Sequence, residues 1–488
     1  MKPAFFPQIK RFFCVSSKKK SLEIFYGKKR WQKQKSDTQL TIVFSGNKCY
    51  NFYTIIIMRC SIMKKVSVVV IGFGDRAVAY TKYALNNPDR LEVKAVIDPD
   101  PFRRGLAKEM FDLPDDMLFE HMDDCLKLGK IADAVINATM DELHIPTAIP
   151  FLKLGYDMLL EKPITNNKKD LLELKKIADE NGCKLMICHV LRYTPFYLKI
   201  KEIIASGEIG DIVEMETNEL VGVAHSSASY IRGKWNNRDK CGSSMLLAKC
   251  CHDADLLCWF NSGAKPVKVA SYGGRYHFIE RNAPVGSGTR CLVDCQVEKE
   301  CPYSCKKLLL DNEYFAQYTF TCIDKKYEEL TMEEKTESLK TNNPMGRCIY
   351  KTDANIVDRQ AVIVEFDNGS IATHSMIAGA SRPGRNILII GTKGEIQGFL
   401  EDNKFIVRTY NPANCLWNER VEKITNIVAG DGHSGGDSRL VNDFVNMEMG
   451  IPRSISSTVI EDSINGHLLV YAADESLDNG GVSVKIEQ

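Results

Sequence analysis

A glycine-containing turn that follows an apolar strand is the clearest chemical signal in this sequence. Residues 66–71 (VSVVVI) are nearly all β-branched, which predicts a buried strand, and the chain then turns at Gly72. Gly72 permits a tight turn, Gly74 lets the backbone approach a pyrophosphate, and Ala77 is small enough for close helix packing. The helix that follows presents free N–H groups to phosphates. The predicted dinucleotide-binding residues of this turn are Gly72, Phe73, Gly74, Asp75, Arg76 and Ala77.

An acidic residue after the next strand indicates which dinucleotide binds. Residues 91–97 predict a second strand, which ends at Asp98. A carboxylate in that place binds the ribose hydroxyls of NAD and repels the 2′-phosphate of NADP. NAD is therefore the expected cofactor, although Arg103 and Arg104 lie close enough downstream to leave NADP open.

A lysine after a later strand supplies a group that can move a proton. Residues 156–160 predict a short strand that ends at Glu161-Lys162-Pro163. Hydride transfer from an alcohol leaves a hydroxyl proton to be removed, and a lysine whose pKa is depressed by desolvation can accept it. Glu161 would orient the lysine or contact the nicotinamide ribose. The alternative is an ordinary surface lysine in a turn.

Strands and helices alternate between residues 63 and 190, and this alternation places the candidate residues on one edge of a sheet. Buried strands are expected at 66–71, 91–97, 132–138, 156–160 and 183–188, with helices between them. The pattern predicts an α/β fold that begins with a Rossmann domain, a doubly wound parallel sheet. Ligands of such sheets bind beyond the carboxyl ends of the strands, where Gly72, Asp98, Thr139 and Lys162 would meet.

From residue 191 to 488 the pattern predicts an α+β domain with a large, mostly antiparallel open sheet. Tight turns such as 367–369 (DNG) separate the expected strands at 212–221, 267–276, 361–366, 371–377, 386–391, 394–400 and 404–410. Helices are expected at 196–205, 245–259, 437–449 and 456–475. Residues 287–350 are interpreted as an insertion, with a charged helix or loop at 325–340.

Composition and charge limit the class of protein. The chain has 488 residues, of which 44% are hydrophobic and 26% charged, as is ordinary for a globular protein. Residues 1–62 hold 13 Lys and Arg against 2 acidic residues, so the remainder is net acidic, which argues against a nucleic-acid partner. Seventeen irregularly spaced cysteines indicate reduced thiols and a cytoplasmic protein. No apolar run approaches the roughly 18 residues that would indicate a membrane partner.

Residues 1–62 form a basic extension without a clear hydrophobic period. We expect it to lie outside the fold, either disordered or the product of a misassigned start before Met63. A basic tail that binds an acidic surface is the alternative.

Together these motifs resemble the Gfo/Idh/MocA family of oxidoreductases, which includes glucose–fructose oxidoreductase and inositol 2-dehydrogenase. The resemblance covers about residues 64–475, and its most specific parts are 161–163 (EKP), Thr139 with His144, and Arg192-Tyr193. It implies that Lys162 is catalytic and that its bond to Pro163 is cis. It also implies a homodimer or homotetramer. The further cofactor-binding residues that it implies are Asp98, Thr139, His144, Glu161, Lys162 and Arg192.

His252, in the expected helix 245–259, is the second catalytic candidate. Members of the family often have Asp four residues before this histidine, whereas this chain has Ala248, so that Lys249 or Asp253 would have to substitute. Imidazole titrates near neutrality and suits an acid/base role, and a structural histidine between domains is the alternative. His225 is a weaker sugar-contacting candidate. The expected substrate-binding residues are Lys162, Tyr193, Trp235, Lys249 and His252.

Two further stretches carry residues that could bind a metal or approach a ligand. Cys291, Cys295, Cys301 and Cys305 could bind zinc, but their spacing is unusual, so we expect packed thiols and no metal. The sequence 432–437 (GHSGGD) would either approach a ligand or cap a helix.

The predicted function is therefore an NAD(P)-dependent oxidoreductase that transfers a hydride between a nicotinamide and a small carbohydrate-like molecule. Lys162 would be the acid/base together with His252. One alternative is an NAD-dependent glycosidase that works by transient oxidation and elimination. The other is a non-catalytic dinucleotide-binding sensor, which Ala248 favours.

Overall fold

The computed structural model describes residues 39–45, 54–60, 65–313, 315–425 and 432–487, which fall into two compact units, residues 1–64 and 65–488. In the first unit, β1 (Gln39–Ser45) pairs antiparallel with β2 (Thr54–Cys60). This strand pair was not foreseen for the N-terminal extension. The other residues of 1–62 lie outside the described residues.

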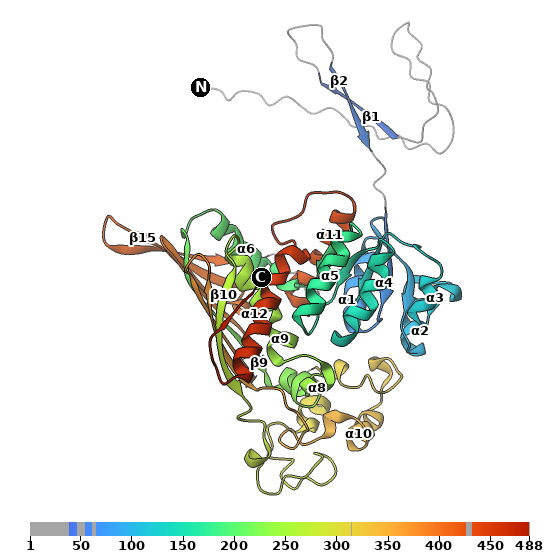
Figure 1. Cartoon of the computed structure of the whole chain (residues 1–488). Coiled ribbons are helices and arrows are strands. Elements are labelled where there is room, and N and C mark those ends of the chain that lie inside the picture. Colours follow the sequence, from blue (N-terminus) through green and yellow to red (C-terminus); the bar gives the residue numbers. More distant parts are fainter. Residues whose placement is uncertain (1–38, 46–53, 61–64, 314, 426–431, 488) are drawn as a thin grey trace, which may run out of the picture. The chain divides into compact units, whose positions relative to one another are not determined.

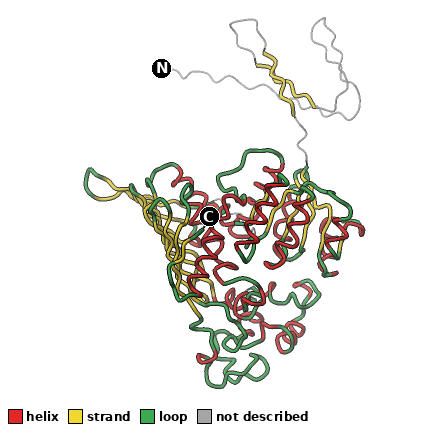
Figure 2. The backbone as a smooth tube through the Cα atoms, viewed as in Figure 1, coloured by secondary structure: helices red, strands yellow, loops and turns green. Residues whose placement is uncertain are grey.

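Six strands of the second unit form a parallel sheet in the order β5-β4-β3-β6-β7-β8 (Figures 1 and 2). Every neighbouring pair within it is parallel, so the doubly wound prediction is confirmed. The bounds are β3 (Val66–Ile71), β4 (Leu91–Ile97), β5 (Leu118–Phe119), β6 (Ala134–Asn137), β7 (Asp157–Leu160) and β8 (Leu185–Ile187).

Helices cover both faces of this sheet. Alternate residues of β3 point to opposite faces and belong to two different hydrophobic cores. Val69 and Ile71 face the core that contains α4 (His144–Lys153) and α5 (Lys168–Glu180). Val68 and Val70 face the core that contains α1 (Asp75–Asn86) and α11 (Gly432–Glu448). Thus α11, which was expected in the second domain, returns to the first sheet.

Nine strands of the described chain form a second sheet in the order β16-β15-β14-β13-β9-β12-β11-β10-β17. Its pairs are antiparallel except for β9 with β12, which confirms a mostly antiparallel sheet. The bounds are β9 (Ile212–Gly222), β10 (Pro266–Gly274), β11 (Arg359–Phe366), β12 (Ile371–Ala380), β13 (Gly384–Gly391), β14 (Gly394–Phe399), β15 (Lys404–Asn411), β16 (Leu416–Lys423) and β17 (Val484–Lys485).

The inner face of the second sheet packs against helices. The helix α9 (Met245–Phe260) contacts β9 and β12, and α12 (Ile460–Asp478) contacts α9 and β10. α6 (Pro195–Ala205) packs beside them, with Phe196 on Phe405 of β15. Along α9, every residue except Lys249 is buried. Polar side chains of α9 therefore need partners within the protein.

Residues between β10 and β11 form a compact addition, as expected of an insertion at about 287–350. It includes α10 (Met332–Lys340), whose Thr331 and Glu334 form a capping box. The insertion has a small hydrophobic core of its own, which also takes in Ala228. The remaining short helices are α2 (Pro101–Phe111), α3 (Met122–Leu126), α7 (Val223–His225) and α8 (Arg238–Cys241).

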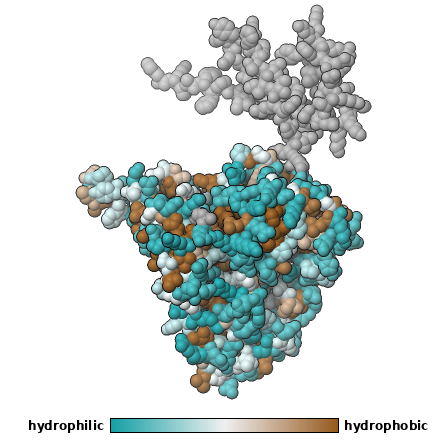
Figure 3. All heavy atoms as spheres, viewed as in Figure 1, coloured by the Kyte–Doolittle hydropathy of each residue, from teal (hydrophilic) through white to brown (hydrophobic). Residues whose placement is uncertain are grey.

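The surface view of Figure 3 shows mainly hydrophilic side chains, with scattered hydrophobic ones. Among the described residues, no helix has the length and apolar character needed to cross a membrane.

An ion pair between Arg192 and Asp255 joins the exit from the first sheet to α9. Arg192 Nε lies 2.7 Å from Asp255 Oδ2, and Nη2 lies 2.5 Å from Oδ1. Both side chains are 1% exposed. Nη1 also donates to the Ser457 carbonyl at 3.0 Å, so the guanidinium is committed to holding three segments together.

Replacing Arg192 with Met should therefore destabilise the fold by about 3–5 kcal/mol, because Asp255 would stay buried without its cation. The double variant Arg192→Met/Asp255→Leu should recover most of that loss, since neither charge then remains. Urea unfolding followed by circular dichroism measures both values. A single variant as stable as the parent protein would contradict a structural role for this pair.

Candidate active site at the carboxyl edge of the first sheet

The glycine turn has the geometry of a phosphate-binding loop. Gly72 has φ +76°, and a Cβ there would lie 2.9 Å from the Ala138 carbonyl oxygen, so a larger residue does not fit. A Cβ on Gly74 would meet only Arg103 Nη1, at 4.0 Å. Gly74 precedes the first turn of α1 and no side chain caps that turn. The start of α1 thus has both the N–H groups and the room that a dinucleotide diphosphate needs.

Asp98 holds this turn in place. Its Oδ2 accepts the Phe73 N–H at 2.7 Å and its Oδ1 accepts the Asp100 N–H at 2.9 Å. The residue is 1% exposed, and the guanidinium of Arg103 lies 3.7 Å from Oδ2. Arg104 donates to the Asp98 carbonyl at 2.6 Å. The predicted ribose-binding carboxylate therefore also positions the loop backbone.

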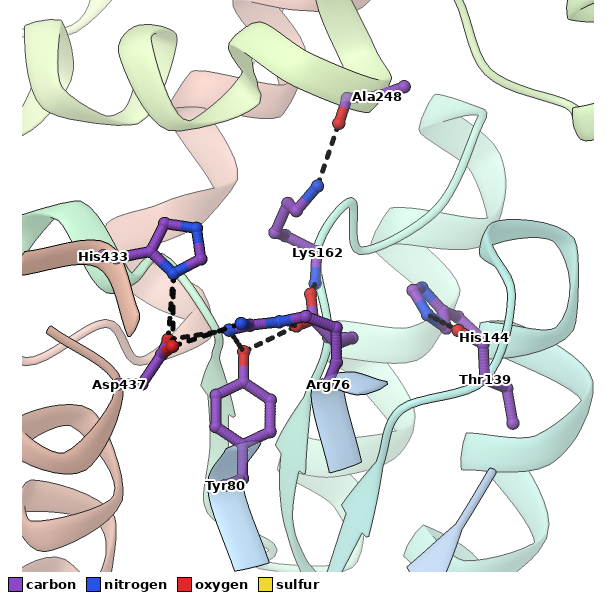
Figure 4. Close-up of polar contacts among 9 residues, drawn as sticks. Arg76, Tyr80, Thr139, His144, Lys162, Ala248, His433 and Asp437 are labelled. Carbon is purple, nitrogen blue, oxygen red and sulfur yellow. Dashed lines mark hydrogen bonds and ion pairs between the residues drawn. The ribbon is translucent and has the colours of Figure 1, made fainter. Parts of the chain in front are cut away.

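A buried network centred on Glu161 fixes the turn that carries Lys162 (Figure 4). Glu161 Oε1 accepts Arg76 Nε at 2.8 Å and the Tyr80 hydroxyl at 2.5 Å, and Oε2 accepts the Lys162 N–H at 2.7 Å. Burial opposes ionisation, but Arg76 and Lys162 outweigh it and lower the pKa of Glu161. An ionised Glu161 is thus locked by α1 and orients the backbone of Lys162.

The network extends to the C-terminal part of the chain. Arg76 Nη2 lies 2.8 Å from Asp437 Oδ1, and His433 Nδ1 lies 3.2 Å from the same carboxylate (Figure 4). Burial opposes ionisation of Asp437, yet His433 and Arg76 hold its pKa below the usual range. The left-handed backbone at His433, Ser434 and Gly435 brings this loop to the site, as its glycine content suggested.

Lys162 projects from the sheet edge toward α9. Its Nζ donates to the Ala248 carbonyl at 2.9 Å, and the Lys162–Pro163 bond is cis, as the resemblance implied. His144 Nδ1 lies 2.6 Å from the Pro163 carbonyl and its Nε2 lies 3.2 Å from the Thr139 carbonyl. His144 is fully buried, so the geometry supports a positioning role for it between the two loops.

His252 lies one helical turn beyond Ala248, on the same face of α9. Its ring centroid is 5.6 Å from His189 and 6.3 Å from His433, and His189 is 5.5 Å from His467. Burial first, and Lys162 second, lower the pKa of His252 well below its ordinary value. His189 and His467 are members of this cluster that sequence reasoning missed, because only their position after β8 and within α12 brings them here.

Arg192 and Tyr193 make structural contacts beside the site. The Arg192 guanidinium is bound to Asp255, and the Tyr193 hydroxyl donates to Asp443 at 2.9 Å. Both side chains are buried. These contacts join segments of the protein, whereas the resemblance implied cofactor binding for Arg192 and we expected substrate binding for Tyr193.

Three other substrate candidates lie on the side of the second sheet. Trp235 Nε1 donates to Asp141 Oδ2 at 3.2 Å. The Trp235 ring lies tilted against that of Tyr230, with the ring centroids 6.1 Å apart, and Tyr230 in turn neighbours His225. Lys249 Nζ lies 3.4 Å from Glu219 Oε1 on β9.

Cys291, Cys295, Cys301 and Cys305 are free thiols in the structure, and no three of their sulfur atoms gather within 4.8 Å. Cys291 and Cys305 contact each other, and this contact together with Arg232 lowers the pKa of Cys291 to about 6.

A glycine turn at the carboxyl edge of a parallel sheet, followed by a second, mostly antiparallel sheet, is the arrangement of a dinucleotide-binding oxidoreductase. The chain belongs to the Gfo/Idh/MocA family: residues 66–189 match its NAD-binding Rossmann fold and residues 201–415 match its C-terminal alpha/beta domain. It is 26% identical over 365 residues to the oxidoreductase YteT of Bacillus subtilis, covering 72% of this chain and 81% of that protein. It is 23% identical over 210 residues to inositol 2-dehydrogenase of Corynebacterium glutamicum, covering 42% of this chain and 57% of that protein.

The fold is also similar to that of levoglucosan dehydrogenase, solved in complex with NADH. The TM-score is 0.63 at 16% identity, covering 87% of this chain and all of that one. At that identity the likeness concerns the fold. The chain is thus an NAD-binding family member, and the glycine turn fits that cofactor.

Gly74→Val should weaken NADH binding by at least about tenfold, because the side chain would occupy the space a diphosphate approaches. Its thermal unfolding midpoint should stay unchanged, since a Cβ there would meet only Arg103 Nη1, at 4.0 Å, without a clash. Gly72→Val is the matched comparison and should lower the midpoint, because Gly72 combines a positive φ with a backbone clash. Fluorescence titration and circular dichroism give the two quantities. Undiminished NADH affinity in Gly74→Val would contradict this placement of the cofactor.

Proposed function

We propose that this protein transfers a hydride between NAD and a hydroxyl-bearing carbon of a sugar, polyol or sugar derivative. The observation that carries the proposal is the placement of Lys162, whose Nζ points from the cofactor edge to α9 and donates to a backbone carbonyl. Among the described residues, no carboxylate forms an ion pair with this ammonium, because Glu161 is occupied by Arg76, Tyr80 and a backbone N–H. Its proton can therefore be exchanged with a bound hydroxyl.

When bound, NAD supplies the carbon that accepts or returns the hydride. The residues that would hold it are the 72–77 turn at the diphosphate, Asp98 at the adenosine ribose, and Thr139 beside the carboxyl end of β6. As the substrate C–H bond gives its hydride away, the hydroxyl proton passes to Nζ of Lys162 in its neutral amine form, which becomes an ammonium, and the substrate oxygen becomes a carbonyl. In the reverse direction Lys162 returns that proton. His252 would contact the same hydroxyl from α9.

The side of the site toward the second sheet would recognise the substrate. Trp235 offers an aromatic face, Lys249 and Lys162 offer hydrogen-bond donors, and Asp141 offers acceptors near Trp235. Such a mixture of an aromatic face with charged hydrogen-bonding groups suits a polyhydroxylated ring. Relatives that match part of this chain include one named 1,5-anhydro-D-fructose reductase and one named 2,7-anhydro-N-acetylneuraminate hydratase. A polyol or sugar oxidation and a redox-neutral reaction therefore both have precedents among relatives.

Lys162→Met should lower kcat on a responsive sugar or polyol by about 10²–10⁴-fold, the usual contribution of a positioned acid/base group. NADH affinity should remain within about threefold, because the diphosphate and ribose contacts are made by other residues. Lys175→Met, on the outer side of α5, is the control and should leave kcat unchanged. The assay is NAD-coupled absorbance over a panel of polyols, sugars and glycosides, with aglycone release measured in parallel.

The outcomes separate the alternatives. Aglycone release without net NADH formation would contradict net redox chemistry and favour a glycosidase that oxidises only transiently. NADH binding without turnover of any panel member would favour a sensor. Full activity of the Lys162→Met variant would show that Lys162 is not the acid/base.

We also propose that the outer face of the second sheet is covered by a second copy of this chain. Apolar side chains stand on neighbouring strands of that face: Tyr272 on β10 is 65% exposed, Ile363 on β11 is 56% exposed, and Ile371 and Ile377 on β12 are 46% and 45% exposed. Exposed apolar side chains on adjacent strands of one sheet face are typical of a protein–protein contact.

Ile363→Glu should convert the assembled protein to a monomer in sedimentation velocity at micromolar concentration, because a charge would be buried in the interface. Val285→Glu, at a loop position 98% exposed, should leave the assembly unchanged. A parent protein that sediments as a monomer would contradict this interface.

A further inference from the structure

A cluster of three potential metal ligands lies between α9 and the second sheet, outside the site described above. Cys250 and Asp253 come from one side of α9, and His374 comes from β12. One ligand atom of each residue lies within 4.8 Å of the other two, and all three residues are buried. Asp253 is 2% exposed and His374 is 4% exposed. The cluster is therefore screened from bulk water.

The hydrogen bonds of His374 determine which ring nitrogen faces the cluster. Its Nδ1 lies 2.9 Å from Thr217 Oγ1, and that hydroxyl donates its own proton to the Thr373 carbonyl at 3.2 Å. When Thr217 gives its single proton to the Thr373 carbonyl, its oxygen accepts from His374 Nδ1–H, and in that tautomer Nε2 carries a lone pair. Nε2 has no hydrogen-bond partner among the described residues. A hydrogen bond from the outer ring nitrogen is the usual support of a metal-binding histidine.

Asp253 presents a second bare acceptor to the same space. Its Oδ1 accepts Arg385 Nε at 2.9 Å, while its Oδ2 has no partner within the described part of the chain. Buried acceptor atoms without a donor are unfavourable. The Cys250 thiol beside them is not within hydrogen-bonding reach of either atom, since both are unpartnered. A positively charged group between the three residues would therefore satisfy these acceptor atoms.

We propose that Cys250 Sγ, Asp253 Oδ2 and His374 Nε2 bind one divalent transition-metal ion of the zinc class. Thiolate and imidazole together select zinc over magnesium or calcium, which prefer oxygen ligands. Binding replaces the thiol proton, which is released to solvent, so the thiolate and the carboxylate balance the two positive charges of the ion. Arg385, which forms an ion pair with Asp253, would then support the ligating carboxylate without contacting the ion itself.

Such an ion would tie α9 to β12 next to the active site. Asp253 directly follows His252, and Cys250 lies two residues after Ala248, whose carbonyl accepts from Lys162. The metal would therefore be structural, and its role is separate from hydride transfer. This inference does not depend on the proposed function, because the metal content is measured without turnover.

The test is elemental analysis of the purified full chain, prepared without chelators and without a metal-affinity step. We expect about one zinc per chain, and at least a tenfold lower content in Cys250→Ser and in His374→Gln. Cys258→Ser, two turns further along α9 and outside the cluster, is the matched control and should keep its metal.

Cobalt exchange covers the case in which a ligand variant fails to fold. Co²⁺ introduced into the parent protein should give a thiolate-to-metal charge-transfer band, and alkylation of the folded protein should modify Cys250 more slowly with the ion bound than after its removal by a chelator. Absence of zinc and of that band in folded parent protein would overturn the proposal in favour of a bridging water. Metal that persists in Cys250→Ser but is lost in Cys291→Ser would overturn it in favour of the insertion cysteines.

Discussion

The burial of α9 on all sides is the constraint on which the rest of this structure depends. A helix between two sheets stabilises both through apolar contacts, but each polar group on it must find a partner inside the protein. Those partners come from a different neighbouring element in each direction. The resulting pairs are Arg192 with Asp255, Arg385 with Asp253, Glu219 with Lys249 and Lys162 with the Ala248 carbonyl. The charged groups that pair with the polar groups of α9 therefore also fix the position of this helix beside the carboxyl edge of the first sheet.

The same logic operates at the edge of the first sheet. Glu161 is buried, so the cation and hydroxyl that keep it ionised must be supplied by α1, which begins at the phosphate-binding turn. Arg76 in turn ties Asp437 and the 432–437 loop to that turn. Glu161 and Asp437, which lie 276 positions apart in sequence, thus share one guanidinium. The 72–77 turn and the turn that carries Lys162 are thus joined through Arg76 and Glu161.

Local patterns were sufficient to predict both sheets and the residues of the glycine turn and the 161–163 turn. A strand buried on two faces and a strand with alternating burial each leave a signature over six to ten residues. By contrast, β16 is exposed along its whole length and carries no such alternation, so it was missed. The sequence also could not show that α11 packs on the first sheet, because its apolar face suits either sheet. His189, His467 and Asp437 join the site only through tertiary contacts between distant segments.

Ala248 illustrates how a departure from a family pattern is resolved by structure. The side chain of Ala248 is buried and offers no proton acceptor, yet its backbone carbonyl receives the hydrogen bond of Lys162. A carboxylate in this place would hold the ammonium in a charge-assisted pair, which is about twice as strong as a hydrogen bond to a neutral acceptor. The carbonyl keeps the direction of the amine toward α9 while binding its proton less firmly. Loss of the acidic side chain therefore preserves the geometry needed for proton exchange, and this favours an enzyme over a protein that only binds the dinucleotide.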